Sequence, residues 1–146
     1  MKVALGNDHA GYLLKESIIG HLNTTRRSCK DFGVLSEESV DYPDIVALVV
    51  KAVLSGEYDC GILICGTGIG MSIAANKYKG IRAALCGEAY SARCAREHNN
   101  ANVLTMGSRV TGQGLAVDIA ETFLTASFEG GRHNRRLEKI IAIENK

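Results

Sequence analysis

The segment Cys65-Gly66-Thr67-Gly68-Ile69-Gly70 follows an apolar run and precedes a stretch with helical spacing. Glycines let the backbone approach a ligand closely, and exposed N–H groups before a helix favour negative charge. The spacing is G-x-G-x-G, whereas dinucleotide loops have G-x-G-x-x-G and Walker loops have G-K-[ST]. The segment therefore predicts a site for a small anion. Glu88, after the next apolar run, keeps a dinucleotide alternative open because it could bind a ribose.

Cys65 stands where the apolar run ends and the glycines begin. A cysteine in an apolar strand is more often inert packing, but a thiol beside a helix N-terminus can act as a nucleophile or base. We therefore single out Cys65 and expect the other cysteines in the core or in incidental positions. The chain has five cysteines and no C-x-x-C pair, so we predict reduced thiols, with neither a disulfide framework nor structural zinc.

Two polar clusters contain histidine. In the first, Asp8 or its neighbour Asn7 could simply cap a helix, but a cap leaves His9 unexplained, and an Asp-His pair can bind a sugar hydroxyl and a phosphate. In the second, His98 and Asn99 end a helical segment, whose dipole favours positive charge, so His98 is a candidate general acid. Asn100 and Asn102 are interpreted as caps or turn residues, His21 as structural and His133 as exposed to solvent.

Arginines gather where the last predicted helix begins. Arg132 and Arg136 have i,i+4 spacing and share one side of the helix, and Arg135 is nearly as close at i,i+3, so spacing does not choose between Arg135 and Arg136. Cations in a first turn oppose the helix dipole, and guanidinium groups bind phosphate through paired hydrogen bonds. With Arg109 as a third group, these arginines predict a small phosphate monoester as the ligand.

The elements that position these residues alternate between short apolar runs and segments with helical spacing. The runs predict strands at 2–6, 28–32, 60–65, 81–86 and 103–106. Helical spacing includes Leu14, Ile18, Ile19 and Leu22, and predicts further helices from near Pro43 and at about 70–78, 88–97, 112–126 and 132–144. This order predicts an α/β fold with a five-stranded parallel sheet between two helical layers, a doubly wound sandwich. Ligands of such sheets bind at the carboxyl ends of the strands. We expect one domain over residues 1–146.

Composition excludes several classes of function. The chain has 146 residues, 46% of them hydrophobic, and a net charge of +1, so it has no overall field to attract nucleic acid or an anionic membrane. No apolar run reaches the roughly 20 residues of a membrane span. The N-terminus turns polar after Leu5, too early for a secretory signal, so we expect a cytoplasmic protein.

Several segments form a pattern that is much more specific together than singly. They are Gly6-Asn7-Asp8-His9-Ala10-Gly11, Asp41-Tyr42-Pro43, Ile64-Cys65-Gly66-Thr67-Gly68-Ile69-Gly70, Gly80-Ile81-Arg82-Ala83, Glu97-His98-Asn99, Gly107-Ser108-Arg109-Val110 and Glu129-Gly130-Gly131-Arg132-His133. Nearly end to end, this set resembles the type B ribose-5-phosphate isomerases, within the larger group that includes the galactose-6-phosphate isomerase subunits. The resemblance implies a Rossmann-like fold and an aldose–ketose isomerase of the pentose phosphate pathway, without metal or cofactor. It also implies a homodimer or a dimer of dimers with sites between subunits.

The resemblance further implies which residues act. Cys65 would take a proton from C2 and return it at C1, Thr67 would help move a proton between the two oxygens, and His98 would open the furanose ring. A branch that lacks this cysteine uses a Glu further along the loop; that region here is Met71-Ser72-Ile73-Ala74, so the chain matches the cysteine branch.

The remaining implied roles concern binding. Asp8 would contact the ring oxygen or hydroxyls, Asn99 would also touch the substrate, and some residues would come from the neighbouring subunit. The backbone amides of Gly66, Thr67, Gly68, Ile69 and Gly70 would bind the enediolate oxygens, and the phosphate would be held by His9, Arg109, Arg132 and Arg136. The resemblance thus selects Arg136 over Arg135.

Two alternatives stay open. The substrate could be a six-carbon sugar phosphate, such as allose 6-phosphate or galactose 6-phosphate, since one more carbon changes only the depth of the pocket. The fold could also serve a non-catalytic sensor of a phosphosugar or dinucleotide, although such a sensor would not need Cys65 and His98 together.

Overall fold

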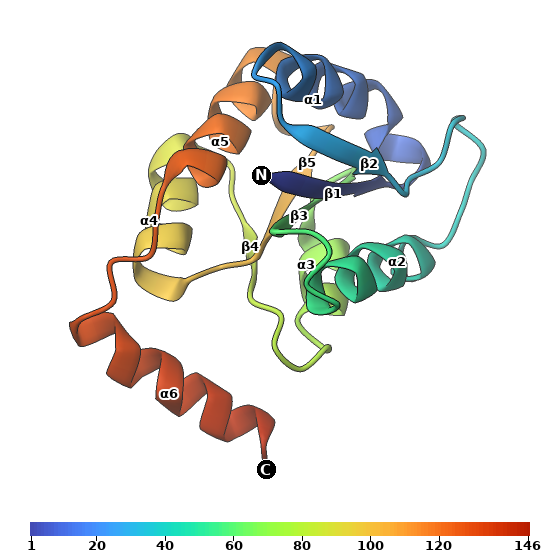
Figure 1. The fold of residues 1–146 in the computed structure, drawn as a ribbon. Coiled ribbons are helices and arrows are strands. Elements are labelled where there is room, and N and C mark those ends of the chain that lie inside the picture. The colour runs from blue at the N-terminus through green and yellow to red at the C-terminus, as the bar shows by residue number, and fades with distance from the viewer.

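The computed structural model describes residues 1–146 and places a parallel sheet between two layers of helices (Figure 1). The sheet order is β2-β1-β3-β5-β4. The strands are β1 (Lys2–Asn7), β2 (Ser28–Asp31), β3 (Cys60–Cys65), β4 (Ala83–Leu85) and β5 (Val103–Gly107). The predicted three-layer, Rossmann-like sandwich with five parallel strands is confirmed.

The helices divide between the two faces of the sheet. On one face lie α1 (Tyr12–Thr24), α4 (Ala89–Asn99) and α5 (Gln113–Thr125). A short 3₁₀ turn, η1 (His9–Gly11), directly precedes α1. On the other face lie α2 (Tyr42–Leu54) and α3 (Ile69–Ala75). All of β3 is buried between these layers because its side chains are apolar on both faces. The helices therefore fix the central strands, and the loops that leave them, from both sides.

Two predicted boundaries were too generous. The helix α3 ends at Ala75 because the Asn76 side chain donates to the Ser72 carbonyl and also pairs with Ala83 of β4. The strand β4 lacks residues 81 and 82 because the Ile81 amide donates to Tyr78 in a turn and the Arg82 amide donates to the side chain of Asn102. Side-chain hydrogen bonds to the backbone thus set both ends.

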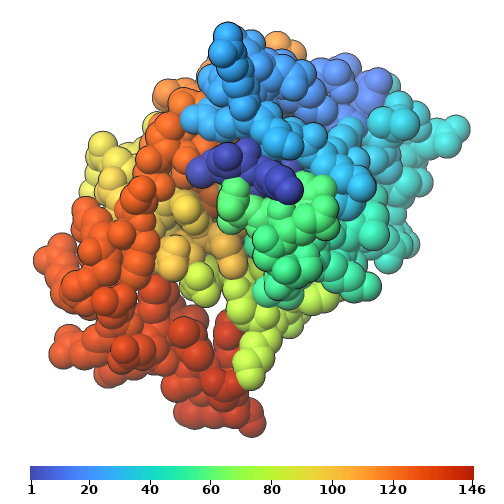
Figure 2. All heavy atoms as spheres, viewed as in Figure 1, coloured from blue at the N-terminus to red at the C-terminus, as the bar shows by residue number.

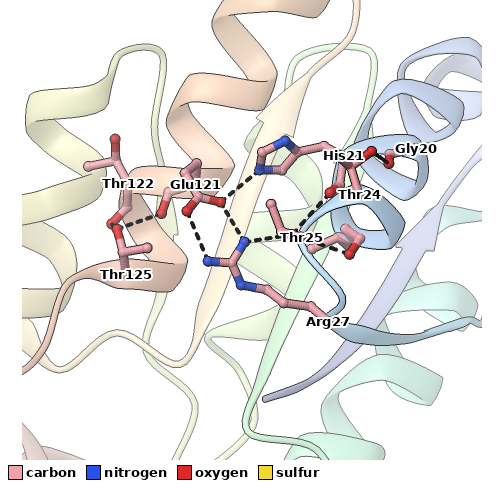
Figure 3. A network of polar contacts seen from close by, with 9 residues as sticks. Gly20, His21, Thr24, Thr25, Arg27, Glu121, Thr122 and Thr125 are labelled. Atoms are coloured by element: carbon pink, nitrogen blue, oxygen red, sulfur yellow. Dashed lines mark hydrogen bonds and ion pairs between the residues drawn. The ribbon is translucent and has the colours of Figure 1, made fainter.

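The ends of α1 and α5 are joined by an ion-pair network (Figure 3). The Glu121 carboxylate of α5 accepts two hydrogen bonds from the Arg27 guanidinium, at 2.5 and 2.9 Å, and lies 2.7 Å from Nε2 of His21. The interpretation of His21 as a structural residue is confirmed.

The last helix, α6 (Arg132–Glu144), projects away from the layered body and approaches it chiefly at α4 (Figure 1). Its apolar side chains are only partly covered: Leu137 is buried, whereas Ile140, Ile141 and Ile143 are exposed. No helix in the structure combines the length and hydropathy required to cross a membrane.

Candidate active site

Three loops leave the sheet side by side at the carboxyl ends of the central strands β1, β3 and β5. Asn7 of β1 pairs with Ile64 of β3, and Cys65 pairs with Gly107 of β5, so the residues that follow these pairs meet at one edge. Backbone hydrogen bonds tie the loops together: the Asp8 amide donates to Ile64, and the Arg109 amide donates to Gly66. The structure therefore brings together Asp8, His9, the 65–70 loop and Arg109.

The glycine loop folds back over the sulfur of Cys65. The Gly68 amide donates to Sγ at 3.1 Å, and Cys65 itself is buried. Gly68 has φ +77°, and an added Cβ there would lie 2.6 Å from Leu85 Cδ1 and 2.9 Å from the carbonyl carbon of Met106. Only glycine fits this turn. A larger residue would push the amide away from the thiol.

Several amides of this loop have no acceptor in the chain. Those of Gly66, Thr67 and Gly70 make no hydrogen bond within the protein, while the Ile69 amide donates to the Thr67 hydroxyl at 3.3 Å. Free N–H groups beside a buried thiol form a place where an oxygen bearing negative charge would be stabilised. The anion site predicted from the glycines has this geometry, although α3 is too short to add a large dipole.

Asp8 and His9 are each partly committed to the protein. One carboxylate oxygen of Asp8, Oδ1, accepts from the amides of Ala10 and Gly11 at 2.9 and 3.1 Å, which confirms the capping interpretation and leaves Oδ2 unused. The Val40 amide donates to Nδ1 of His9 at 3.4 Å. A neutral His9 then carries its proton on Nε2, the nitrogen that would donate to an anion.

Arg109 extends along the glycine loop. An added Cβ at Gly66 would lie 3.4 Å from Cδ of Arg109 and 3.5 Å from its Nε and Nη1, so the guanidinium lies against the loop backbone. A cavity of about 300 Å³ beside it is lined by Ala10, Leu13, Leu14, Ser108, Arg109, Thr111, Gly112 and Gln113. The positively charged side chain of Arg109 therefore lies next to a cavity at the carboxyl ends of the strands.

Sequence reasoning assigned no role to Tyr42, although it belongs to one of the segments that carry the resemblance. An added Cβ at Gly70 would lie 2.7 Å from Cζ and 2.9 Å from the hydroxyl of Tyr42, so this ring covers the far end of the glycine loop. The signal in the sequence was the absence of a side chain at Gly70, which leaves room for a large neighbour.

The other predicted residues form a second cluster, at the junction of α4 and α6. The rings of His98 and His133 stack with centroids 4.5 Å apart, and Nε2 of His133 lies 3.5 Å from the Glu129 carboxylate. Arg132 and Arg136 are close enough that their charges help lower the pKa of His133, after burial, which is the largest cause. The prediction that His133 is exposed is wrong: it is 3% exposed, because its ring is covered by that of His98.

The two clusters lie at opposite ends of the strands: the Cys65 cluster at the carboxyl ends and the His98 cluster at the amino ends. The helix α4 begins after the carboxyl end of β4 and ends before the amino end of β5, where the Asn102 carbonyl accepts from the amide of Gly61 at the start of β3. His98 and Asn99 are therefore separated from Cys65 by the length of β3, roughly 16 Å at the rise of a strand. Within one chain His98, Asn99, Arg132 and Arg136 do not reach Cys65. Asn100, with φ +45°, caps α4, and Asn102 bonds to Gly80 and Arg82, as expected.

The larger cavity of the molecule lies away from the Cys65 loop. Its volume is about 400 Å³, and it lies between α6 and the edge strand β4, where Figure 2 shows a hollow beside the last helix. Its lining is mainly apolar and includes Ile81, Ala84, Ile140 and Ile143, and of the predicted site residues only Asn99 touches it.

Comparison with known proteins gives a consistent result. Residues 3–140 match the family model described as Ribose/Galactose Isomerase. The chain is 52% identical over 145 residues to ribose-5-phosphate isomerase B of Escherichia coli strain K12, covering 99% of this chain and 97% of that protein. It is also 45% identical over 146 residues to ribose-5-P isomerase B of Listeria innocua, covering 100% and 99%.

Solved structures agree in fold. Ribose-5-phosphate isomerase B of Clostridium thermocellum superposes with a TM-score of 0.97 at 54% identity, covering 99% of this chain and 98% of that one. Ribose-5-phosphate isomerase B of Mycoplasma genitalium, solved with bound ribulose-5-phosphate, gives a TM-score of 0.93 at 44% identity, covering 99% and 97%. The chain belongs to the ribose/galactose isomerase family.

Proposed function

We propose that the protein interconverts ribose 5-phosphate and ribulose 5-phosphate. The observation that carries this proposal is the buried Cys65 thiol beside the free amides of its glycine loop, in a chain about half identical to isomerases of that name. Isomerisation removes a proton from the carbon next to a carbonyl, so the enzyme must supply a base and must stabilise an enediolate. The site has a candidate for each.

Cys65 is the base. As a thiolate it takes the C2 proton of the open-chain aldose and returns a proton to C1, while the Thr67 hydroxyl passes a proton between O1 and O2. The amides of Gly66, Thr67 and Gly70 receive the enediolate oxygens, and each preorganised donor in such a site supplies roughly 3–4 kcal/mol. This division of work requires no metal or cofactor.

The rest of the site comes from a second copy. We propose a homodimer, alone or within a dimer of dimers, in which His98, Asn99, Arg132 and Arg136 of one subunit face Cys65, Asp8, His9 and Arg109 of the other. The separation of the two clusters in one chain supports this arrangement. In the composite site the phosphate meets His9 and three arginines, while His98 and Asp8 act on the furanose ring.

The chain as a whole fits this assignment. We propose that residues 1–146 form one sugar-phosphate isomerase domain and that it works in the cytoplasm, where Cys65 and the other free cysteines remain reduced. The family also contains galactose isomerases, so a six-carbon sugar phosphate is the second candidate substrate.

The test is conversion of ribose 5-phosphate by purified protein with a chelator present, run beside allose 6-phosphate and the Cys65→Ala variant. We expect conversion of the pentose that the chelator leaves intact and the variant abolishes. Conversion of allose 6-phosphate alone would show that the substrate is a six-carbon sugar phosphate, while the proposed mechanism would stand. No conversion of either sugar would overturn the proposal.

A further inference from the structure

His133 is the most buried polar side chain of the α4–α6 cluster and the least explained. It is 3% exposed, and neither ring nitrogen makes a hydrogen bond in the chain. The Glu129 carboxylate lies 3.5 Å from its Nε2. Buried polar groups usually have hydrogen-bond partners, so the part of His133 that serves the rest of the chain is its ring face and not its nitrogens.

The ring of His133 lies face to face with that of His98. The centroids are 4.5 Å apart and the planes differ by 8°. The two rings belong to different helices, and the Glu129 amide holds those helices together by donating to the Glu97 carbonyl at 3.0 Å. The His133 amide in turn donates to Gly130, whose φ of +66° suits glycine. The chain therefore fixes His133 against His98 through its backbone.

Burial and neighbouring charges both favour the neutral form of His133. Burial lowers its pKa, the charges of His98, Arg132 and Arg136 act in the same direction, and Glu129 opposes them. A neutral ring does not repel a proton carried by His98. The ligand atoms of His98, Glu129 and His133 are also close enough for a cation, but the two arginines make the surroundings unfavourable for one.

We propose that His133 is a positioning residue whose ring face holds the imidazole of His98 in the orientation required to open the cyclic sugar. In that step the anomeric hydroxyl gives its proton to the free Oδ2 of Asp8 from the other subunit, the bond between C1 and the ring oxygen breaks, C1 becomes a carbonyl, and the ring oxygen gains a proton from His98. The step needs no redox partner. This inference rests on the proposed function and assigns His133 a part in only one of its steps.

The test compares ribose 5-phosphate with its 4-deoxy analogue, which lacks the hydroxyl that closes the ring and so needs no opening. His133→Leu removes the aromatic face, and His133→Phe keeps the face without nitrogens. Leu137→Ala, one turn further along α6, is the control for general loosening of the helix. Thermal unfolding of every variant checks that it folds.

We expect His133→Leu to lower kcat/KM for ribose 5-phosphate by about 10- to 100-fold, the effect of misplacing a catalytic group by about 1 Å. The same variant should lower kcat/KM for the 4-deoxy analogue only slightly. His133→Phe should retain most of the wild-type kcat/KM for ribose 5-phosphate. Parallel losses on both sugars, as expected for Leu137→Ala, would overturn the inference. So would a His133→Phe variant as impaired as His133→Leu, a comparison that needs no analogue. Wild-type protein inactive on ribose 5-phosphate would instead overturn the proposed function and this inference with it.

Discussion

Arg135 and Arg136 are neighbours near the start of α6 and are both exposed, yet they differ in their surroundings. The charges that lower the pKa of His133 include those of Arg132 and Arg136 but not that of Arg135. Spacing alone left this choice open. The structure supports Arg136 as the member of the pair that belongs to the His98 cluster.

We therefore expect Arg136→Ala to raise KM for the sugar phosphate by about 10- to 100-fold, because a hydrogen bond to a charged group contributes about 1.5–3 kcal/mol. The turnover number should change little. Steady-state kinetics of Arg136→Ala and of Arg135→Ala as the matched control provide the measurement. A loss confined to kcat, or equal effects of the two substitutions, would contradict the phosphate-binding role.

Lys15 is the residue whose burial most needs an explanation. Its side chain is fully buried, and Nζ lies 2.7 Å from the Asp31 carboxylate and 2.6 Å from the Val34 carbonyl. These contacts fasten the segment after β2, which also carries the Val40 amide that bonds to His9. The spacing of apolar residues predicts a helix at this position, but it does not predict that the Lys15 side chain is buried.

Lys15→Met keeps the apolar stem and removes the charge. We expect it to lower the free energy of unfolding by about 1–3 kcal/mol, the cost of leaving buried acceptors without a donor. Asp31 is 24% exposed and so retains some contact with water, which favours the lower part of that range. Urea unfolding measures the change, with the exposed Lys30→Met as control. Equal stability of the two variants would contradict the structural role.

At the scale of elements, the sequence predicted which segments form strands and helices because buried parallel strands are apolar on both faces. The predicted strand at 60–65 matches β3 to the residue. What periodicity missed is set by side chains that compete with the backbone, as Asn76 does at the end of α3. Such contacts depend on the partner strand, which only the assembled fold brings near.

The junction of α1 and α5 gives a pH-dependent prediction. Hydrogen bonds from Arg27 hold the pKa of Glu121 at about 2, below its usual 4.5; burial opposes this shift and His21 adds to it. A depressed pKa in the folded state stabilises the protein above pH 4.5, and that contribution is lost as the pH falls toward 2.

We expect Glu121→Gln to be less stable than the wild type by about 1 kcal/mol near pH 6, a reduced figure because solvent screens a partly exposed carboxylate. The difference should shrink steadily from pH 5 to pH 2. Urea unfolding over this range measures it, with the exposed Glu16→Gln as control. A difference that is constant with pH would show that the ion pair does not contribute.

At the scale of the whole molecule, the sequence named both halves of the candidate site but did not show that they lie apart. The topology explains the separation. A helix that follows a parallel strand runs back from the carboxyl ends of the strands to their amino ends, so the end of α4 places His98 far from Cys65. The exposed isoleucines of α6 and of α3, among them Ile143 at 67% and Ile73 at 58%, remain uncovered in a single chain. In the proposed homodimer a second copy would cover this apolar surface while completing the site.

Mixing two inactive variants tests this arrangement directly. Cys65→Ala removes the base from one half-site, and Arg132→Ala with Arg136→Ala removes phosphate binding from the other. If the halves come from different subunits, each hybrid dimer has one site with both halves intact and one with neither. Co-expression with random pairing should then restore about a quarter of wild-type activity, since half of the dimers are hybrids with one working site. If one chain supplied the whole site, both sites of every hybrid would be defective and the mixture would stay as inactive as its components.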